Sequence, residues 1–391
     1  MSDPTRPLLA VYVVWHPDFV DGPEIAEALR AHFRKELYQN IAGGTGLSVI
    51  YRSEPPPGDV TPLSIDITES ETSAVVVLLD PTLVGDGQWK AYIQNLENVT
   101  DAAGLGARLF PVFIDPSGSK IGLKPQAFRW DQWVGSIIER GQRLTFELTY
   151  EFCRMLRHYL EHLKHPTDDD EALQAYVKKV QIFLSHSKHD ADGQRIAKAI
   201  RDALHAGHGL ASFFDVNDIP AGLPFDKVLL LHVRVSAVVA IHTDSYSSRE
   251  WCRREVLEAK RCHVPMVVAN CISDVDERNF PYMGNVPVIR LDPKNLDRID
   301  LMIGRLLDEV LKDFLWRCRV ELYRATAGAY VVFVPRPPEL IALATLPPIK
   351  DVPTPTVVYP DPPLGAEEEA LFRTVAPHVR LLSLTAWLAT P

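Results

Sequence analysis

The segment Ser247–Glu255, which reads SSREWCRRE, follows an apolar run at 236–241 that is typical of a buried strand, and it is predicted to open a helix. Positions i and i+4 share one face of a helix, so Trp251 and Glu255 are expected to be neighbours. An aromatic ring one turn before a carboxylate can stack a flat heterocycle and stabilise a cation beside it. The pair therefore indicates a candidate ligand or catalytic site.

Outward from this segment, strand patterns alternate with helix patterns from residue 8 to about residue 320, which predicts parallel sheets with crossover helices. The pattern occurs twice, with an Asp-Gly pair after each first strand and a Trp at the start of a later helix. Strands are expected at 11–14, 47–52, 74–79 and 108–114, and again at 181–184, 211–215, 237–241 and 264–270. Helices are expected at 23–33 and 142–163, and at 194–204 and 296–323.

These units suggest a domain plan. Residues 1–165 form the first unit, 166–177 an acidic linker, and 178–325 the second unit. Between Val331 and Pro391 lie 12 of the 31 prolines, but the stretch still has strand patterns at 329–334, 356–359 and 379–384 and a helix pattern at 365–374. We expect residues 326–391 to be a small α/β module, a candidate for regulation or ligand sensing.

Composition excludes several classes of function. The chain has 391 residues and a net charge of −10, which argues against general nucleic-acid binding. No apolar run approaches the length of a membrane span, and the first 18 residues look like a strand and not a signal peptide. The five cysteines form no CxxC pair or zinc pattern, so we expect reduced thiols, no metal and a cytoplasmic location.

Three segments of the second unit carry a family resemblance: IFLSHS at 182–187, FDVNDIPAG at 214–222 and SSREWCRRE at 247–255. Together, in this order, they resemble the Toll/interleukin-1 receptor (TIR) domain of bacterial proteins over about residues 178–320. The resemblance implies a flavodoxin-like parallel sheet that binds its ligand outside the carboxyl ends of the strands.

The resemblance also implies a reaction. Catalytic TIR domains cleave the bond between nicotinamide and ribose in NAD+, which would be a substrate, with no separate cofactor. Glu255 matches the catalytic glutamate of the family, and Trp251 matches the aromatic residue one turn earlier. Ser187 and Lys188 lie at a turn that contacts substrate in family members. The loop from Asp215 to Phe225 matches a mobile loop that covers the substrate and helps subunits assemble. An NAD+ nucleosidase that works as a homo-oligomer through TIR–TIR contacts follows as the expectation.

Alternative interpretations stand beside these assignments. Glu255 could be a solvated helix glutamate, and Trp251 could pack in the core at a helix start. Cys252 is better interpreted as a small buried residue than as a nucleophile, since no histidine base is placed for it. The first motif, SHSKHD at 185–190, departs from the animal and plant versions, which affects the contacts assigned to Ser187 and Lys188.

The first unit has the Trp without the acid. Trp89 opens its helix, and Ile93 stands where Glu255 stands in the second unit. Because an apolar side chain cannot stabilise a cation, we predict a degenerate, catalytically silent TIR-like domain with a role in assembly or sensing. An unrelated flavodoxin-like domain is the alternative.

Three functions remain open. The first is an antiphage defence effector that depletes NAD+ when a trigger, such as a phage component or a nucleotide signal, causes assembly. The second is a TIR enzyme that makes a cyclic ADP-ribose signal. The third is a non-catalytic scaffold built from two TIR-like units.

Overall fold

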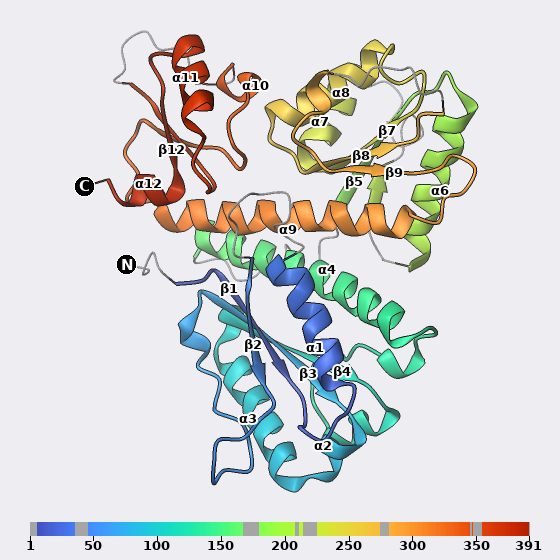
Figure 1. Cartoon of the computed structure of the whole chain (residues 1–391), viewed down its shortest axis with the longest axis vertical. Coiled ribbons are helices and arrows are strands. Elements are labelled where there is room, and N and C mark those ends of the chain that lie inside the picture. The colour runs from blue at the N-terminus through green and yellow to red at the C-terminus, as the bar shows by residue number, and fades with distance from the viewer. Residues whose placement is uncertain are drawn as a thin grey trace. The chain divides into compact units, whose positions relative to one another are not determined.

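The computed structural model describes residues 6–35, 46–166, 180–207, 211–213, 225–273, 281–344, 346 and 354–390. The chain divides into two compact units (Figure 1). The N-terminal unit contains Met1–Tyr176 and Cys318–Ala325, and the C-terminal unit contains Val177–Arg317 and Thr326–Pro391. The predicted acidic linker falls almost wholly at 167–179, outside the described residues.

The N-terminal unit is built on a parallel sheet in the order β2-β1-β3-β4. Its strands are β1 (Leu9–Val14), β2 (Ser48–Arg52), β3 (Thr72–Leu79) and β4 (Ala107–Phe113), and its helices are α1 (Gly22–Arg30), α2 (Pro81–Gly85), α3 (Gly87–Ala102) and α4 (Ile137–Lys164). In the central register, Val11 pairs with Val49 on β2 and with Ala74 on β3. Every residue of β1 and β3 is buried, as expected for central strands covered on both faces.

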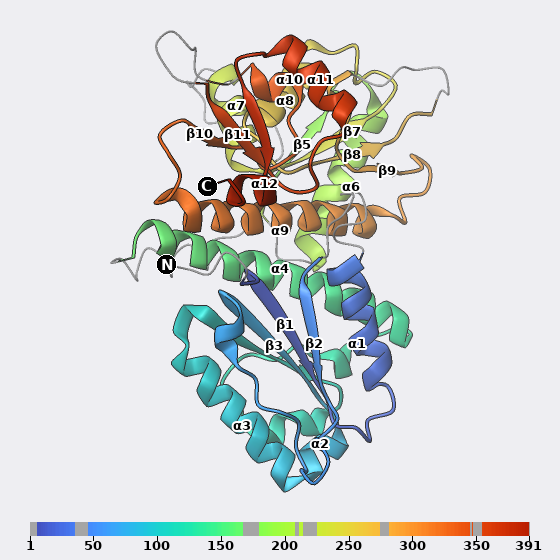
Figure 2. The same ribbon diagram turned by 60° about the vertical axis from the view of Figure 1, so that its left-hand side comes forward.

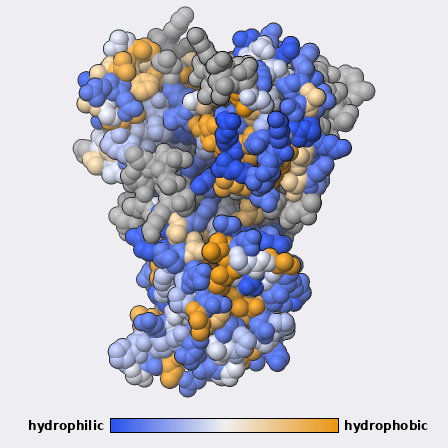
Figure 3. Space-filling view, turned by 45° about the vertical axis from the view of Figure 1, so that its right-hand side comes forward, coloured by the Kyte–Doolittle hydropathy of each residue, from blue (hydrophilic) through white to orange (hydrophobic). Residues whose placement is uncertain are grey.

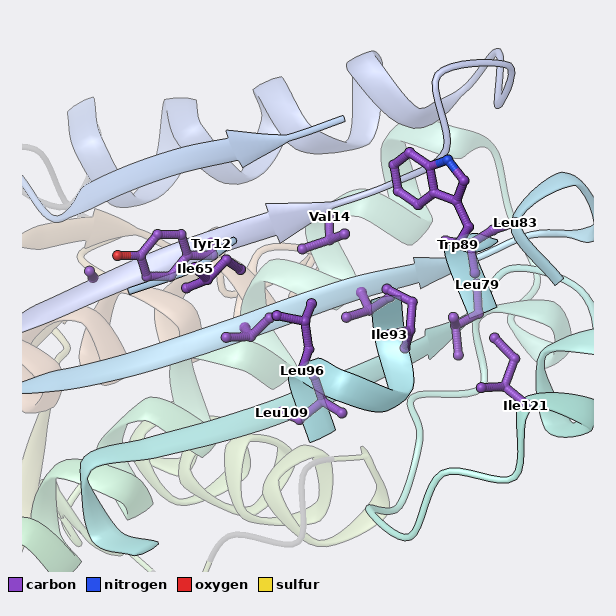
Figure 4. Close-up of a cluster of buried hydrophobic side chains, with 13 residues drawn as sticks. Tyr12, Val14, Ile65, Leu79, Leu83, Trp89, Ile93, Leu96, Leu109 and Ile121 are labelled. Atoms are coloured by element: carbon purple, nitrogen blue, oxygen red, sulfur yellow. The ribbon is translucent and has the colours of Figure 1, made fainter. Parts of the chain in front are cut away.

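Helices cover both faces of this sheet (Figures 1 and 2). On one face, Trp89 and Ile93 of α3 pack against alternate residues of the strands, including Val14 (Figure 4). On the opposite face, Phe152 of α4 lies against Phe110 of β4, with 5.8 Å between ring centroids. The hydrophobic core of the unit is thus divided into two layers by the sheet.

The C-terminal unit contains a five-stranded parallel sheet in the order β6-β5-β7-β8-β9. Its strands are β5 (Gln181–His186), β6 (Ala211–Phe213), β7 (Ala237–His242), β8 (Met266–Asn270) and β9 (Val288–Arg290), and its helices are α6 (Ala191–Gly207), α7 (Phe225–Val235), α8 (Glu250–Arg261) and α9 (Ile299–Arg324). This 2-1-3-4-5 order is flavodoxin-like, so the predicted fold class is confirmed. The four described strands of the N-terminal sheet repeat the first four places of this order, whereas the TIR-like origin of that unit stays a prediction.

A second sheet in the C-terminal unit belongs to the C-terminal module, residues 326–391. Its three parallel strands lie in the order β10-β11-β12. They are β10 (Val331–Phe333), β11 (Thr356–Tyr359) and β12 (Arg380–Ser383), with helices α10 (Leu340–Leu343), α11 (Ala366–Val375) and α12 (Leu384–Leu388). Its small hydrophobic core includes Val357, Tyr359 and Val379. The strands and the helix expected from sequence are all present.

Polar contacts tie the module to helix α8. Lys260, near the end of α8, has a side chain only 5% exposed, and its Nζ lies 2.8 Å from Glu339 Oε1 just before α10. The same ammonium donates to the Gly284 carbonyl at 2.7 Å. Arg336, which follows β10, donates to the Val264 carbonyl at 3.3 Å and lies 3.4 Å from Glu309 on α9.

Helix α9 contributes to both units. Its residues up to Arg317 belong to the C-terminal unit, and Cys318–Arg324 belong to the N-terminal unit. Within the N-terminal unit, Arg319 donates to the Arg6 carbonyl at 3.1 Å. The Cys318 thiol lies 3.4 Å from the Leu156 carbonyl of α4.

The surface mixes polar and apolar side chains. On the face drawn in Figure 3, hydrophilic residues predominate and hydrophobic ones gather in patches between them. Within the described ranges, no helix is both long enough and apolar enough to cross a membrane.

Candidate active site

A pocket of about 410 Å³ lies at the carboxyl end of β5, where an open parallel sheet ordinarily binds its ligand. One wall comes from the end of β5 and the turn after it, at Phe183–Leu184 and His186–His189. The other wall comes from the start of α8, at Ser248–Cys252, and from Glu255 one turn further on. The helix that the segment Ser247–Glu255 was predicted to open begins at Glu250. It brings Trp251 and Glu255 to one cavity, as the sequence predicts.

Glu255 is held at this pocket by a chain of hydroxyl groups. The Ser185 hydroxyl, from β5, donates to Oε2 of Glu255, whose side chain is nearly buried. Ser185 Oγ also lies 2.5 Å from the Tyr246 hydroxyl. Because serine has one proton and gives it to the carboxylate, Tyr246 must donate to Ser185. The chain thus runs from Tyr246 to Ser185 to Glu255.

Burial determines the protonation of two groups beside Glu255. Tyr246 is fully buried, and burial, with the nearby Cys252 and Glu255, raises its pKa well above the usual range. Burial, reinforced by Glu255, also raises the pKa of the Cys252 thiol to about 12. Tyr246 is therefore a neutral donor at physiological pH, and Cys252 is a protonated thiol and not a nucleophile.

Trp251 lies at the exposed rim of the pocket. Its side chain is 38% exposed, which rules out the alternative of core packing. The Arg254 guanidinium lies over its ring, 4.2 Å from the centroid. In the N-terminal unit the equivalent Trp89 is 1% exposed and sits in the core beside Ile93 (Figure 4). The two tryptophans thus occupy similar sequence positions but different environments.

Ser187 and Lys188 both line the pocket, in different ways. Lys188 is exposed. Ser187 is 1% exposed, and its hydroxyl lies 2.7 Å from Ser245 Oγ and accepts a hydrogen bond from the His189 backbone at 3.3 Å. Ser187 therefore shapes the turn that carries Lys188.

Asp190 anchors this turn to the loop after β7. Its carboxylate accepts from Thr243 Oγ1 at 2.7 Å, from the Ser245 hydroxyl and from the backbone N–H of Gly193. Burial acts to raise the pKa of Asp190, but hydrogen bonds from Ser245 and Thr243 outweigh it and hold the pKa below its usual range. Sequence reasoning missed Asp190, Ser185 and Tyr246. Ser185 and Asp190 do lie within the motif SHSKHD at 185–190, and Tyr246 follows β7, at the edge of the sheet where the site was expected.

Arg249 adds an unused donor. It precedes α8 and lines the pocket. Its Nε is buried and has no hydrogen-bond partner within the described part of the chain. A buried donor without a partner is costly, so this nitrogen is a polar group that the described packing leaves unsatisfied.

Two predicted site residues cannot be placed. Asp215 lies outside the described residues. Phe225 begins α7, but its side chain is not described. Across the described ranges, no group of three or more His, Cys, Asp or Glu side chains could hold a metal ion.

Comparison with known proteins gives one family match. Residues 182–302 match the family model described as the TIR domain. No curated protein matches the chain. Among solved structures, the C-terminal domain of glucosamine-fructose-6-phosphate aminotransferase from Francisella tularensis aligns at 12% identity over 81% of this chain and 84% of that one, but its TM-score of 0.20 does not establish a shared fold. The five-stranded sheet, the pocket at its carboxyl edge and the family match agree that this chain contains a TIR domain at residues 182–302.

Proposed function

We propose that the TIR domain is an NAD+ nucleosidase that cleaves the bond between nicotinamide and ribose. The observation that carries this proposal is the nearly buried Glu255 carboxylate, fixed by Ser185 at the wall of a pocket whose rim bears the exposed Trp251. The pocket volume of about 410 Å³ falls within the range of small-molecule sites.

In the proposed reaction, the bond between C1′ and the pyridinium nitrogen breaks, and its electron pair leaves with neutral nicotinamide. The ribose becomes oxocarbenium-like, and water adds to C1′ with loss of a proton. Glu255 would stabilise the developing positive charge and hold the ribose hydroxyls. Ser185 and Tyr246 would keep its carboxylate in place, so they are positioning residues.

Other side chains suit the remaining parts of NAD+. The exposed ring of Trp251 offers a stacking surface for a flat heterocycle. Arg249 and Lys188 both line the pocket, and their positive charges suit the pyrophosphate. The loop Asp215–Phe225 would cover the bound substrate, set in place by a neighbouring subunit in a homo-oligomer.

The proposed biological setting is a cytoplasmic antiphage effector. NAD+ depletion harms the cell that contains the enzyme, so the activity has to wait for a trigger, such as a phage component or a nucleotide signal. The N-terminal unit, with Ile93 in place of the acid, would then serve assembly or sensing. The C-terminal module, which contacts α8 through Lys260 and Glu339, would serve regulation.

The test is nicotinamide release from NAD+ by the full-length protein, concentrated with a crowding agent to favour assembly. Wild type should release nicotinamide, and Glu255→Gln should lose at least about 100-fold in rate because the charge that stabilises the transition state is gone. Glu97→Gln is a matched control, since Glu97 is a buried glutamate on α3, the corresponding helix of the N-terminal unit. Full activity of Glu255→Gln would refute the assignment.

The two alternatives have distinct outcomes in the same assay. A cyclic ADP-ribose product, separated from ADP-ribose by chromatography, would indicate a signalling enzyme that uses the same Glu255. No nicotinamide release under any condition, together with a phenotype that survives Glu255→Ala, would indicate a scaffold.

A further inference from the structure

A second cavity, of about 510 Å³, lies on the other side of helix α8. We call it the α8 groove. Helices α7 and α8 and the short helix α10 of the C-terminal module border it, and α10 lies beside α8 (Figure 1). Its lining combines apolar and cationic side chains: Leu230, Leu257, Tyr282, Ile341, Arg254 and Arg261.

The charge of the α8 groove favours an anion. Among the described residues that line the groove, Glu258 is the one carboxylate, and it is already paired with Arg234, whose Nε lies 2.5 Å away. The Nη1 of Arg261 lies 3.8 Å from Oε2 of Glu258, beyond hydrogen-bond distance, and the Arg261 side chain is 61% exposed. Arg254 and Arg261 therefore leave a positive field over the groove, although the chain as a whole carries a net charge of −10.

The apolar side chains of the lining favour a ligand with an apolar part over an inorganic ion. Leu230, Leu257 and Ile341 would remain wet beneath a bare phosphate or sulfate. Tyr282, which also lines the groove, is 44% exposed and carries an aromatic ring. A ligand that covers these side chains and also meets the arginines has a flat apolar body and one anionic group.

The C-terminal module completes this cavity. Ile341 and Ala344 come from the module, and the remaining lining comes from the TIR domain. The ion pair between Lys260 and Glu339 fixes the module against α8 two residues before Ile341. A ligand in the groove would thus contact both parts of the C-terminal unit.

The α8 groove also adjoins the candidate active site through one pair of side chains. Arg254 lines the groove, and the ring over which its guanidinium lies belongs to Trp251, which lines the pocket with Glu255. A ligand anion that draws Arg254 toward itself would compete with this contact.

We propose that the α8 groove is a binding site for a small amphipathic anion, one with a flat apolar body and a single phosphate, sulfonate or carboxylate. The site is separate from the pocket of Glu255, and the proposal holds whether or not the TIR domain cleaves NAD+.

The test uses a matched pair of probes on the full-length protein. 8-Anilinonaphthalene-1-sulfonate has the required anion and flat body, and N-phenyl-1-naphthylamine is the same ring system without the charge. We expect saturable binding of the sulfonate by fluorescence titration, at least about tenfold tighter than binding of the neutral probe. The neutral probe has no sulfonate and therefore cannot make the charge-assisted contact with the arginines.

Variants locate the binding. Arg261→Gln should weaken sulfonate binding about tenfold, and Ala344→Trp should abolish it by filling the groove. Arg253→Gln is the matched control, since Arg253 is an exposed arginine of the same helix that lines neither cavity. Lys188→Gln, in the other pocket, should also leave binding unchanged.

Two results would overturn the proposal. One is wild-type affinity for the sulfonate in the Arg261→Gln variant. Because Arg261 is exposed, this variant should fold normally, so its result tests the proposal even if Ala344→Trp misfolds. The other is equal affinity for the charged and the neutral probe.

Discussion

Ser185 at the end of β5 donates a hydrogen bond to Glu255 on α8, across 70 positions of sequence. The bond joins the first strand of the TIR domain to the helix that carries the proposed catalytic glutamate. Behind Ser185, the buried Tyr246 supplies the next donor. The position of the carboxylate therefore depends on two residues that do not line the pocket themselves.

Removing the Ser185 hydroxyl should separate positioning from binding. We expect Ser185→Ala to lower kcat for nicotinamide release by about 10- to 100-fold with little change in KM, since the carboxylate loses its fixed orientation while the pocket keeps its shape. Tyr246→Phe should have a smaller effect, because Ser185 still donates to Glu255. Ser236→Ala, at a buried serine whose hydroxyl has no partner within the described residues, is the control and should keep wild-type kcat. A fall in binding alone would contradict the positioning role.

The two equivalent tryptophans should respond in opposite ways. Trp89→Ala removes a 1% exposed ring from the core of the N-terminal unit and should cost about 3–5 kcal/mol of unfolding free energy. Trp251→Ala removes a ring that is 38% exposed, so stability should change little while KM for NAD+ rises. Urea unfolding and steady-state kinetics on both variants check this. Equal destabilisation by the two substitutions would show that Trp251 packs as Trp89 does.

The buried ion pair between Lys260 and Glu339 predicts a non-additive pair of substitutions. Glu339→Gln leaves the Lys260 ammonium, whose side chain is 5% exposed, without its counter-charge and should destabilise the C-terminal unit by about 1–3 kcal/mol, since Glu339 itself is 28% exposed. Lys260→Met combined with Glu339→Gln should recover much of that loss, because no buried charge remains. Glu369→Gln, which removes an exposed pair with Arg373, should have little effect. A double-mutant cycle by urea unfolding measures the coupling energy between the two side chains. Additive changes in unfolding free energy would show that the two side chains do not stabilise each other.

Asp313 on α9 makes stability depend on pH. Burial raises its pKa to about 6, although Arg317 and Arg336 act to lower it. Because the folded state holds the proton more tightly than the unfolded state, stability falls as the pH rises from about 4 to 6. Above about pH 6, the ionised and buried Asp313 carboxylate lowers the stability of the folded protein.

Asp313→Asn removes that charge. We expect its thermal midpoint to exceed that of wild type by about 2–4 °C at pH 8 and to match it at pH 4, where Asp313 is already neutral. The lost ion pair with Arg317, at 2.8 Å, matters less because the Arg317 side chain is 49% exposed. A lower midpoint than wild type at pH 8 would mean that the ion pair outweighs the burial of the charge. Scanning calorimetry at the two pH values makes the comparison.

Much of the fold could be predicted because short, continuous stretches of sequence determine many of its strands and helices. The runs that form β1 and β3 are apolar throughout, which is what a strand with two covered faces requires. Strand β9, only three residues long with one buried side chain, was missed for lack of such a run. Helix α4 begins at Ile137, five residues before the predicted start, because Ser136 and Glu139 form a capping box that the sequence does contain.

The site was only half predictable. Trp251 and Glu255 are one helical turn apart, so a single segment places them together. The contacts of Ser185 with Glu255 and of Asp190 with Thr243 and Ser245 join side chains 53 to 70 positions apart, and only the packed sheet brings them together. Hydrogen bonds of that kind have no periodicity in the sequence.

Helix α9 has a practical consequence for anyone who divides this protein. Because Cys318–Ala325 belong with the N-terminal unit, expression of residues 1–176 alone would omit part of that unit, including the bonds from Arg319 to Arg6 and from Cys318 to Leu156. A fragment that starts at Val177 would carry the same segment without its partners. Neither half is a self-contained piece of chain, so loss of activity in a truncated fragment would not identify the deleted region as regulatory.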